Sequence, residues 1–292
     1  MARIPRKLPP ITITEDERRQ IDVANASERP VVVFIHGLWL LSSSWERWRE
    51  LFEQAGYATV APSWQDDPRT VAEARADPEV FAGKTIGQVA NHVAEVLNAL
   101  AAERAMVGHA IGGLLAQIIA AHGFSRATVA IDPAPFRGIH KLPSSALKAA
   151  KPVLRSPANW GREVTLTFEE FRSAWANAVS EEEARLLYDQ FHVAAPGAPL
   201  FQSALANLNP YSNANLDPKS RVRGPLLLVS GGQDETVPWE LTNGAFKLQR
   251  RNRGVTEIVE IPERGHSLTI DGGWREVAET ALAFVRRFVQ PG

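Results

Sequence analysis

The sequence predicts an α/β fold in which a mostly parallel central sheet is covered by helices on both faces. Six short apolar runs rich in β-branched residues alternate with segments whose apolar residues recur at helical spacing. Strands that are apolar along their whole length are typical of a parallel sheet buried on both faces. The 292 residues, of which 45% are hydrophobic and 22% charged, suffice for one large core with an insertion.

The predicted strands and helices follow one another along the chain. The strands cover residues 31–37, 58–63, 105–109, 127–132, 225–232 and 255–262. Two helix starts have the spacing of a capping box, because Ser43 precedes Glu46, and Thr85 precedes Gln88, by three residues. A final helix with an apolar stripe from Trp274 to Phe288 is expected to dock on the sheet.

The stretch between Asp132 and about Gly224 lacks strand-like runs but contains helix-like patterns. We therefore predict a helical lid over residues 133–223. The lid is inserted into a core made of residues 1–132 and 224–292. The absence of an internal repeat favours one domain with an excursion over two independent domains.

Composition excludes several classes of function. The formal net charge of -1 offers no sequence-wide electrostatic reason to bind nucleic acid or an anionic membrane, so we expect a small-molecule substrate. With no cysteine, the chain cannot form a disulfide, a thiolate nucleophile or a Cys-ligated metal site. The histidines show no paired ligand spacing, so we expect neither a metal nor another cofactor. No apolar run of signal-peptide length follows the basic N-terminus, which predicts a cytoplasmic protein.

One segment has the pattern of a sharp turn between a strand and a helix. AMVGHAIGG places Gly108, Ala110 and Gly112 directly after a buried strand and at the start of an apolar helix. This is the context of a nucleophile elbow, whose central residue has a strained backbone. Glycines on either side allow the strand and the helix to approach closely.

The elbow segment resembles the GHSxGG motif of the α/β-hydrolase superfamily, with alanine where that family has serine. Three further segments resemble loops of the same family: HGLW at 36–39 the oxyanion loop, GGQDETVP at 231–238 the acid loop, and RGHS at 264–267 the base loop. They occur in the family's chain order, and the resemblance covers roughly residues 30–290. It implies the α/β-hydrolase fold and a serine esterase or lactonase.

The resemblance assigns a role to each residue that acyl transfer requires. A hydroxyl at position 110, now Ala110, would attack the carbonyl, His266 would accept its proton, and Asp234 would orient the imidazole. The backbone amides of Leu38 and Ile111 would stabilise the oxyanion.

Further residues near these motifs have alternative interpretations. Asp132, also at a strand end, is the alternative acid, although the acid-loop match at Asp234 is more specific. We expect His36 to bond backbone and shape the oxyanion loop. His109 could line the pocket or be structural, and Trp39 could contact an acyl chain or a ring.

Two lid tryptophans, Trp160 and Trp175, could face either substrate or core. The Arg250, Arg251 and Arg253 cluster is interpreted as a solvated helix end. Residues 62–85 depart from the Gly-rich, Ser-containing turn found there in the family, which leaves the subfamily and the pocket shape open.

Ala110 has two explanations: a deliberate replacement of serine that traps substrate, or a natural chain that has lost or never used hydrolysis. We favour the first, because alanine keeps the Cβ and removes only the oxygen, whereas glycine would relieve the strained turn. The alternatives are a cofactor-free lyase, oxygenase or carbon–carbon hydrolase that uses His266 and Asp234, and a ligand-binding pseudoenzyme. The tryptophan-rich chain favours an apolar or aromatic ester or lactone as substrate.

Overall fold

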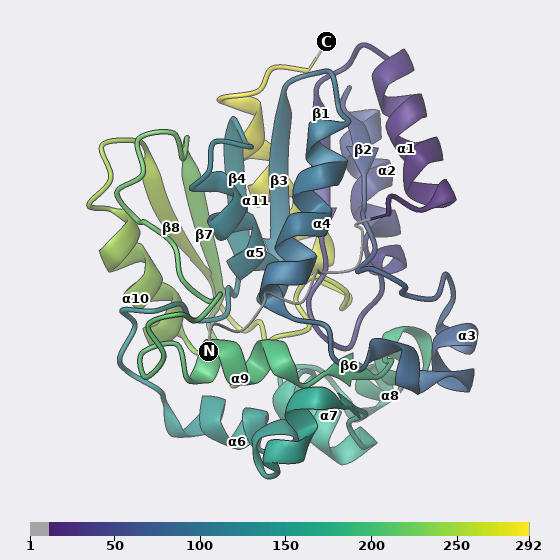
Figure 1. Cartoon of the computed structure of the whole chain (residues 1–292), viewed down its shortest axis with the longest axis vertical. Helices are drawn as coiled ribbons and strands as arrows, with labels where there is room; N and C mark the ends of the chain where they lie inside the picture. Colours follow the sequence, from purple (N-terminus) through teal and green to yellow (C-terminus); the bar gives the residue numbers. More distant parts are fainter. Residues whose placement is uncertain (1–11, 292) are drawn as a thin grey trace, which may run out of the picture.

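The computed structural model describes residues 12–291 and has a central sheet of six parallel strands (Figure 1). The strands are β1 (Val31–Ile35), β2 (Ala58–Val60), β3 (Arg104–His109), β4 (Ala127–Ile131), β7 (Leu226–Gly231) and β8 (Thr256–Ile261). Their order across the sheet is β2-β1-β3-β4-β7-β8. Each predicted strand is present, which confirms the fold class.

Helices cover both faces of this sheet. The helices of the core are α1 (Glu15–Ala26), α2 (Glu46–Gln54), α3 (Val71–Ala76), α4 (Ile86–Asn98), α5 (Ile111–Ala120), α10 (Trp239–Gln249) and α11 (Trp274–Arg286). Alternate residues of β1 belong to two separate apolar clusters. Val31, Val33 and Ile35 pack with α1, α4, α5 and α10. Val32 and Phe34 pack with α2 and α11 on the opposite face.

Two of the three predicted helix features are confirmed. Thr85 caps α4, and the side chain of Gln88 reaches back to the Thr85 backbone N–H at 3.0 Å. Helix α11 docks on the sheet, with Val277 and Val285 fully buried.

The capping box predicted at Ser43 and Glu46 is wrong. Residues Ser42–Trp45 form a 3₁₀ turn, η1, and α2 begins at Glu46 with no side-chain cap. The Trp45 side chain is 2% exposed, and we attribute the absence of the Ser43 cap to the burial of this side chain. The turn places that ring 5.3 Å from the ring of Phe34 on β1.

The segment predicted as a lid contains helices between β4 and β7. These are α6 (Ser144–Leu154), the 3₁₀ turn η3 (Pro157–Gly161), α7 (Phe168–Ala174), α8 (Glu181–Phe191) and α9 (Ala198–Ala204). Two short antiparallel strands that the sequence did not predict, β5 (Glu163–Val164) and β6 (Ala195–Pro196), pair within it. We call residues 133–223 the cap segment. It lies below the sheet in Figure 1.

The cap segment is tied to the loops that follow the strands. Trp39 Nε1 donates to the Val164 carbonyl at 2.9 Å, and Thr236 Oγ1 donates to the Ala174 carbonyl at 2.6 Å. The cap segment therefore covers the carboxyl ends of the strands, which is where ligands bind in open α/β sheets. Across residues 12–291, no helix combines the length and apolar character needed to cross a membrane.

Candidate active site

Ala110 stands at a strained turn between β3 and α5. Its backbone has φ 53° and ψ -119°, a conformation that residues with a Cβ rarely adopt. A Cβ on Gly108 would lie 2.2 Å from the Gly112 carbonyl oxygen, and one on Gly112 would lie 2.1 Å from the Ile35 carbonyl oxygen. The two glycines are therefore required by the close approach of strand and helix, as the motif predicts.

His266 and Asp234 form a buried hydrogen-bonded pair. His266 follows β8, Asp234 follows β7, and His266 Nδ1 lies 2.6 Å from Asp234 Oδ2. The other carboxylate oxygen of Asp234 accepts the backbone N–H groups of Thr236 at 2.7 Å and Val237 at 2.8 Å. Both oxygens of this carboxylate thus have hydrogen-bond partners. The pair is arranged to hold the imidazole in one orientation with Nε2 free to act as a base.

An apolar cavity of about 80 Å³ connects these residues. Ala110 and His266 both line it, and most of the remaining lining is aliphatic or aromatic. The hydroxyls of Ser203 and Thr236 are engaged by the carbonyls of other residues. His266 is the one titratable group in the lining that the described residues form. A ligand in this cavity meets a largely apolar surface in which His266 can accept a proton.

The two residues that carry the predicted oxyanion amides line the same cavity. Leu38 and Ile111 both line it and are 3% and 2% exposed. Within residues 12–291, neither backbone N–H has a hydrogen-bond acceptor. A Cβ on Gly37 would lie 3.0 Å from the Ala110 Cβ, so a side chain at position 37 would crowd the nucleophile position. Two unpaired buried N–H groups beside the elbow can receive a developing negative charge.

His36 makes a hydrogen bond within the loop that carries Leu38. Its Nδ1 makes the predicted backbone hydrogen bond, at 2.9 Å from the Gly37 carbonyl. Its ring stacks on Trp64, and Nε2 lies 3.5 Å from Asp67, which pairs with Lys84 at 2.5 Å. Burial lowers the pKa of His36 to about 4 and raises that of Asp67 to about 6. The atypical residues 62–85 therefore place the Asp67–Lys84 ion pair against the ring of His36.

Asp132 lies beside the pair without joining it. Its Oδ1 accepts the Gly231 N–H at 2.8 Å, whereas its buried Oδ2 has no partner among the described residues. Burial, followed by the negative charge of the nearby Asp234, raises the pKa of Asp132 well above 3.8. Two adjacent buried carboxyls cannot both be ionised cheaply, so Asp132 is the protonated member. Of the two candidate acids, Asp234 is the one hydrogen-bonded to His266.

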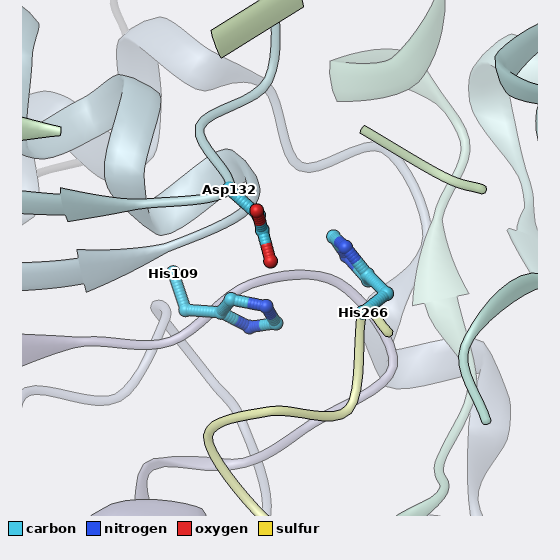
Figure 2. A group of neighbouring side chains, drawn as sticks. All are labelled: His109, Asp132 and His266. Carbon is cyan, nitrogen blue, oxygen red and sulfur yellow. The ribbon is translucent and has the colours of Figure 1, made fainter. Parts of the chain in front are cut away.

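His109 faces His266 and Asp132 from the end of β3 (Figure 2). It is fully buried, its ring centroid lies 4.6 Å from that of His266, and neither ring nitrogen has a hydrogen-bond partner among the described residues. Burial, and then the neighbouring His266, lowers the pKa of His109 well below 6.5, so its imidazole is neutral. His109 does not line the cavity. Of the two interpretations, the structural one fits this placement.

Ligand atoms of His109, Asp132 and His266 lie within 4.8 Å of one another, close enough to hold a divalent cation. Their spacing in the sequence gave no sign of this cluster, because His109 ends β3, Asp132 follows β4 and His266 follows β8. A cation there would engage His266, the imidazole that is hydrogen-bonded to Asp234. Metal binding and base chemistry would therefore compete at this site.

Of the three tryptophans considered as substrate contacts, two line the cavity and one does not. Trp39, at φ 62°, lines the cavity as predicted for a substrate contact. Trp175 also lines it, and its ring stands edge-on to His266 at 4.5 Å. Its helical sequence context is equally typical of a core residue, so no sequence signal distinguished it. Trp160 lies away from the cavity and is 44% exposed.

Comparisons with known proteins agree with this architecture. A family model described as the alpha/beta hydrolase family matches residues 32–280. A monoacylglycerol lipase from Paleococcus ferrophilus superposes with a TM-score of 0.61 at 21% sequence identity, over 90% of this chain and 95% of its own. A polyneuridine aldehyde esterase gives a TM-score of 0.62 at 17% identity, over 87% and 98% of the two chains.

An extracellular alpha/beta-hydrolase from a Paenibacillus species gives a TM-score of 0.60 at 17% identity, over 87% of this chain and 98% of its own. No curated protein matches the chain in sequence. At these identities the structural likenesses concern the fold.

Proposed function

Because the chain belongs to the alpha/beta hydrolase family, we propose that it is the scaffold of a serine hydrolase of carboxylic esters or lactones, with alanine at the nucleophile position. The parent form carries serine at position 110. The chain with Ala110 binds the same ligands and turns them over poorly, if at all. The single observation that carries the proposal is the hydrogen bond of 2.6 Å between Asp234 and His266, because His266 lines the same cavity as Ala110.

The proposed mechanism uses only groups of this chain and needs no cofactor. A hydroxyl at position 110 attacks the carbonyl carbon and gives its proton to His266 Nε2, while Asp234 stabilises the imidazolium. The oxyanion accepts hydrogen bonds from the N–H groups of Leu38 and Ile111. Collapse of the tetrahedral intermediate expels the alcohol, which takes the proton from His266. Water then hydrolyses the acyl-enzyme by the same route.

The substrate class follows from the lining of the cavity. Aliphatic side chains of α6 and α9, together with Trp39 and Trp175, favour an apolar or aromatic acyl group. Both α6 and α9 belong to residues 133–223, which we propose as the lid over a core made of residues 1–132 and 224–292.

The test is the Ala110→Ser variant assayed beside the unchanged chain with short and long p-nitrophenyl esters and a panel of lactones. Loss of the nucleophile in a triad hydrolase costs about 10⁶-fold in turnover, so we expect a gain of at least about 10³-fold. The matched control is Ala110→Gly, which changes the same position without adding a hydroxyl.

Two results would replace the proposal. Turnover by the unchanged chain that Ala110→Ser does not increase would favour a cofactor-free lyase, oxygenase or carbon–carbon hydrolase with His266 as base. Tight ligand binding without turnover by either protein would favour a ligand-binding pseudoenzyme.

A further inference from the structure

Positive charge is concentrated at the start of the cap segment. Residues 137–162 contain no Asp or Glu, although the whole chain has a net charge of -1. They contain six exposed Lys and Arg residues: Arg137, Lys141, Lys148, Lys151, Arg155 and Arg162. Within the described residues, none of the six takes part in a salt bridge. Their charges are therefore available to an external partner.

Exposed apolar side chains accompany these charges. Eleven large apolar side chains are exposed among residues 12–291. Three of them lie in residues 137–162, namely Leu142, Leu147 and Trp160, and three more lie in residues 205–211, namely Leu205, Leu208 and Tyr211. Leu208 is 81% and Tyr211 90% exposed. Residues 197–216 contain no charged side chain.

Direct contacts join the two segments into one surface. The Asn207 side chain donates to the Ile139 carbonyl and accepts the Gly138 N–H, both at 2.7 Å. Arg137 Nη1 donates to the Pro210 carbonyl at 3.3 Å. We call the exposed side chains of residues 137–162 and 205–211 the basic cap face. Helix α6, which carries two of its cations, lies at the outer edge of the molecule, away from the sheet (Figure 1).

The basic cap face adjoins the cavity of the candidate active site. Leu142 and Leu147 are 38% and 48% exposed, and both also line the cavity. The rim of the cavity is therefore part of the same surface.

We propose that the basic cap face docks on the surface of an anionic lipid bilayer. Lys and Arg interspersed with Leu, Trp and Tyr are the composition that binds the headgroup region, because cations meet anionic headgroups while apolar side chains enter the acyl boundary. The net charge of -1 did not predict such a partner, because an excess of acidic residues in the rest of the chain offsets the cations of this face. The cavity of the candidate active site would then open toward the bilayer.

Docking does not depend on hydrolysis, so it is measured with the chain as it stands. Vesicles of phosphatidylcholine alone are compared with vesicles that contain about 30% phosphatidylglycerol, by co-sedimentation at low and high salt. We expect binding to the anionic vesicles only, weakened by salt. Each Lys or Arg near such a surface strengthens binding by about fivefold.

Charge reversal identifies the face. Lys148→Glu together with Lys151→Glu should reduce binding to anionic vesicles by about 25-fold or more. Arg250→Glu together with Arg251→Glu is the matched control, with the same change of charge at exposed positions after α10, and should reduce it much less. Leu208→Ser together with Tyr211→Ser should weaken binding several-fold without altering the unfolding midpoint, since both side chains lie in solvent.

Three results would overturn the proposal. The first is equal binding to neutral and anionic vesicles, or none to either. The second is an equal loss in the control variant. The third is a dimer, seen by light scattering, that Leu208→Ser with Tyr211→Ser dissociates, which would make the face a contact between copies of the chain.

Discussion

Replacing Asp132 by asparagine tests the protonation of the two adjacent carboxyls. Asparagine keeps an oxygen for the Gly231 N–H and places an amide where the protonated oxygen faces Asp234. The folded pKa of Asp132 is raised, so its favourable contribution is complete below the unfolded value near 3.8 and is lost as the pH rises toward the folded value. Asparagine does not titrate and avoids this loss.

The magnitude follows from linkage. While Asp132 holds its proton in the fold and would release it on unfolding, the native protein loses about 1.4 kcal/mol of stability per pH unit through this group. Above pH 3.8, and for as long as the folded protein keeps the proton on Asp132, the free energies of unfolding of the two proteins should therefore diverge by about that much per pH unit, in favour of Asp132→Asn.

The assay is urea unfolding of both proteins at several pH values. Asp189→Asn, at an exposed position of α8, is the matched control and should run parallel to the unchanged chain. Parallel curves for Asp132→Asn and the unchanged chain would refute the raised pKa of Asp132 in the folded protein.

Three further predictions concern Ala110 at the strand–helix turn, the His266–Asp234 pair, and the Asp67–Lys84 ion pair next to His36. Ala110→Gly should raise the melting temperature by about 2–4 °C, because it relieves about 1 kcal/mol of strain at φ 53°; no change in a thermal scan would argue against that strain. In an Ala110→Ser background, Asp234→Asn should lower kcat by about 10⁴-fold in an ester assay, and a loss below tenfold would exclude Asp234 as the acid. Lys84→Met should lower the free energy of unfolding by about 3 kcal/mol at pH 8, because it leaves Asp67 buried without its partner. Adding Asp67→Asn should restore most of this loss in urea unfolding, and no recovery would contradict the ion pair.

The sheet could be predicted because its strands are apolar on both faces. Val31, Val32 and Val33 alternate between two cores, so a continuous apolar run is the only pattern that satisfies both. The elbow could also be predicted, since the close approach at Gly108 and Gly112 excludes any Cβ.

Other features depend on contacts between residues far apart in the sequence. The capping box at Ser43 failed because tertiary burial of Trp45 outweighs a local hydrogen bond. Trp175 reaches His266 only through the fold of the cap segment, and a helical apolar stripe does not indicate which cavity it faces. The raised pKa of Asp132 depends first on its burial in the fold and then on its proximity to Asp234, about a hundred residues later.

The central claim, that position 110 is the nucleophile position of a serine hydrolase, is tested most directly by covalent labelling. The unchanged chain, Ala110→Ser, and Ala110→Ser with His266→Gln are incubated with an alkyl fluorophosphonate and analysed by intact mass and peptide mapping. The account predicts one adduct, at position 110 of Ala110→Ser, with none on the unchanged chain and strongly slowed labelling when His266 is replaced. Labelling of the unchanged chain, or labelling of Ala110→Ser that is absent or independent of His266, would contradict it.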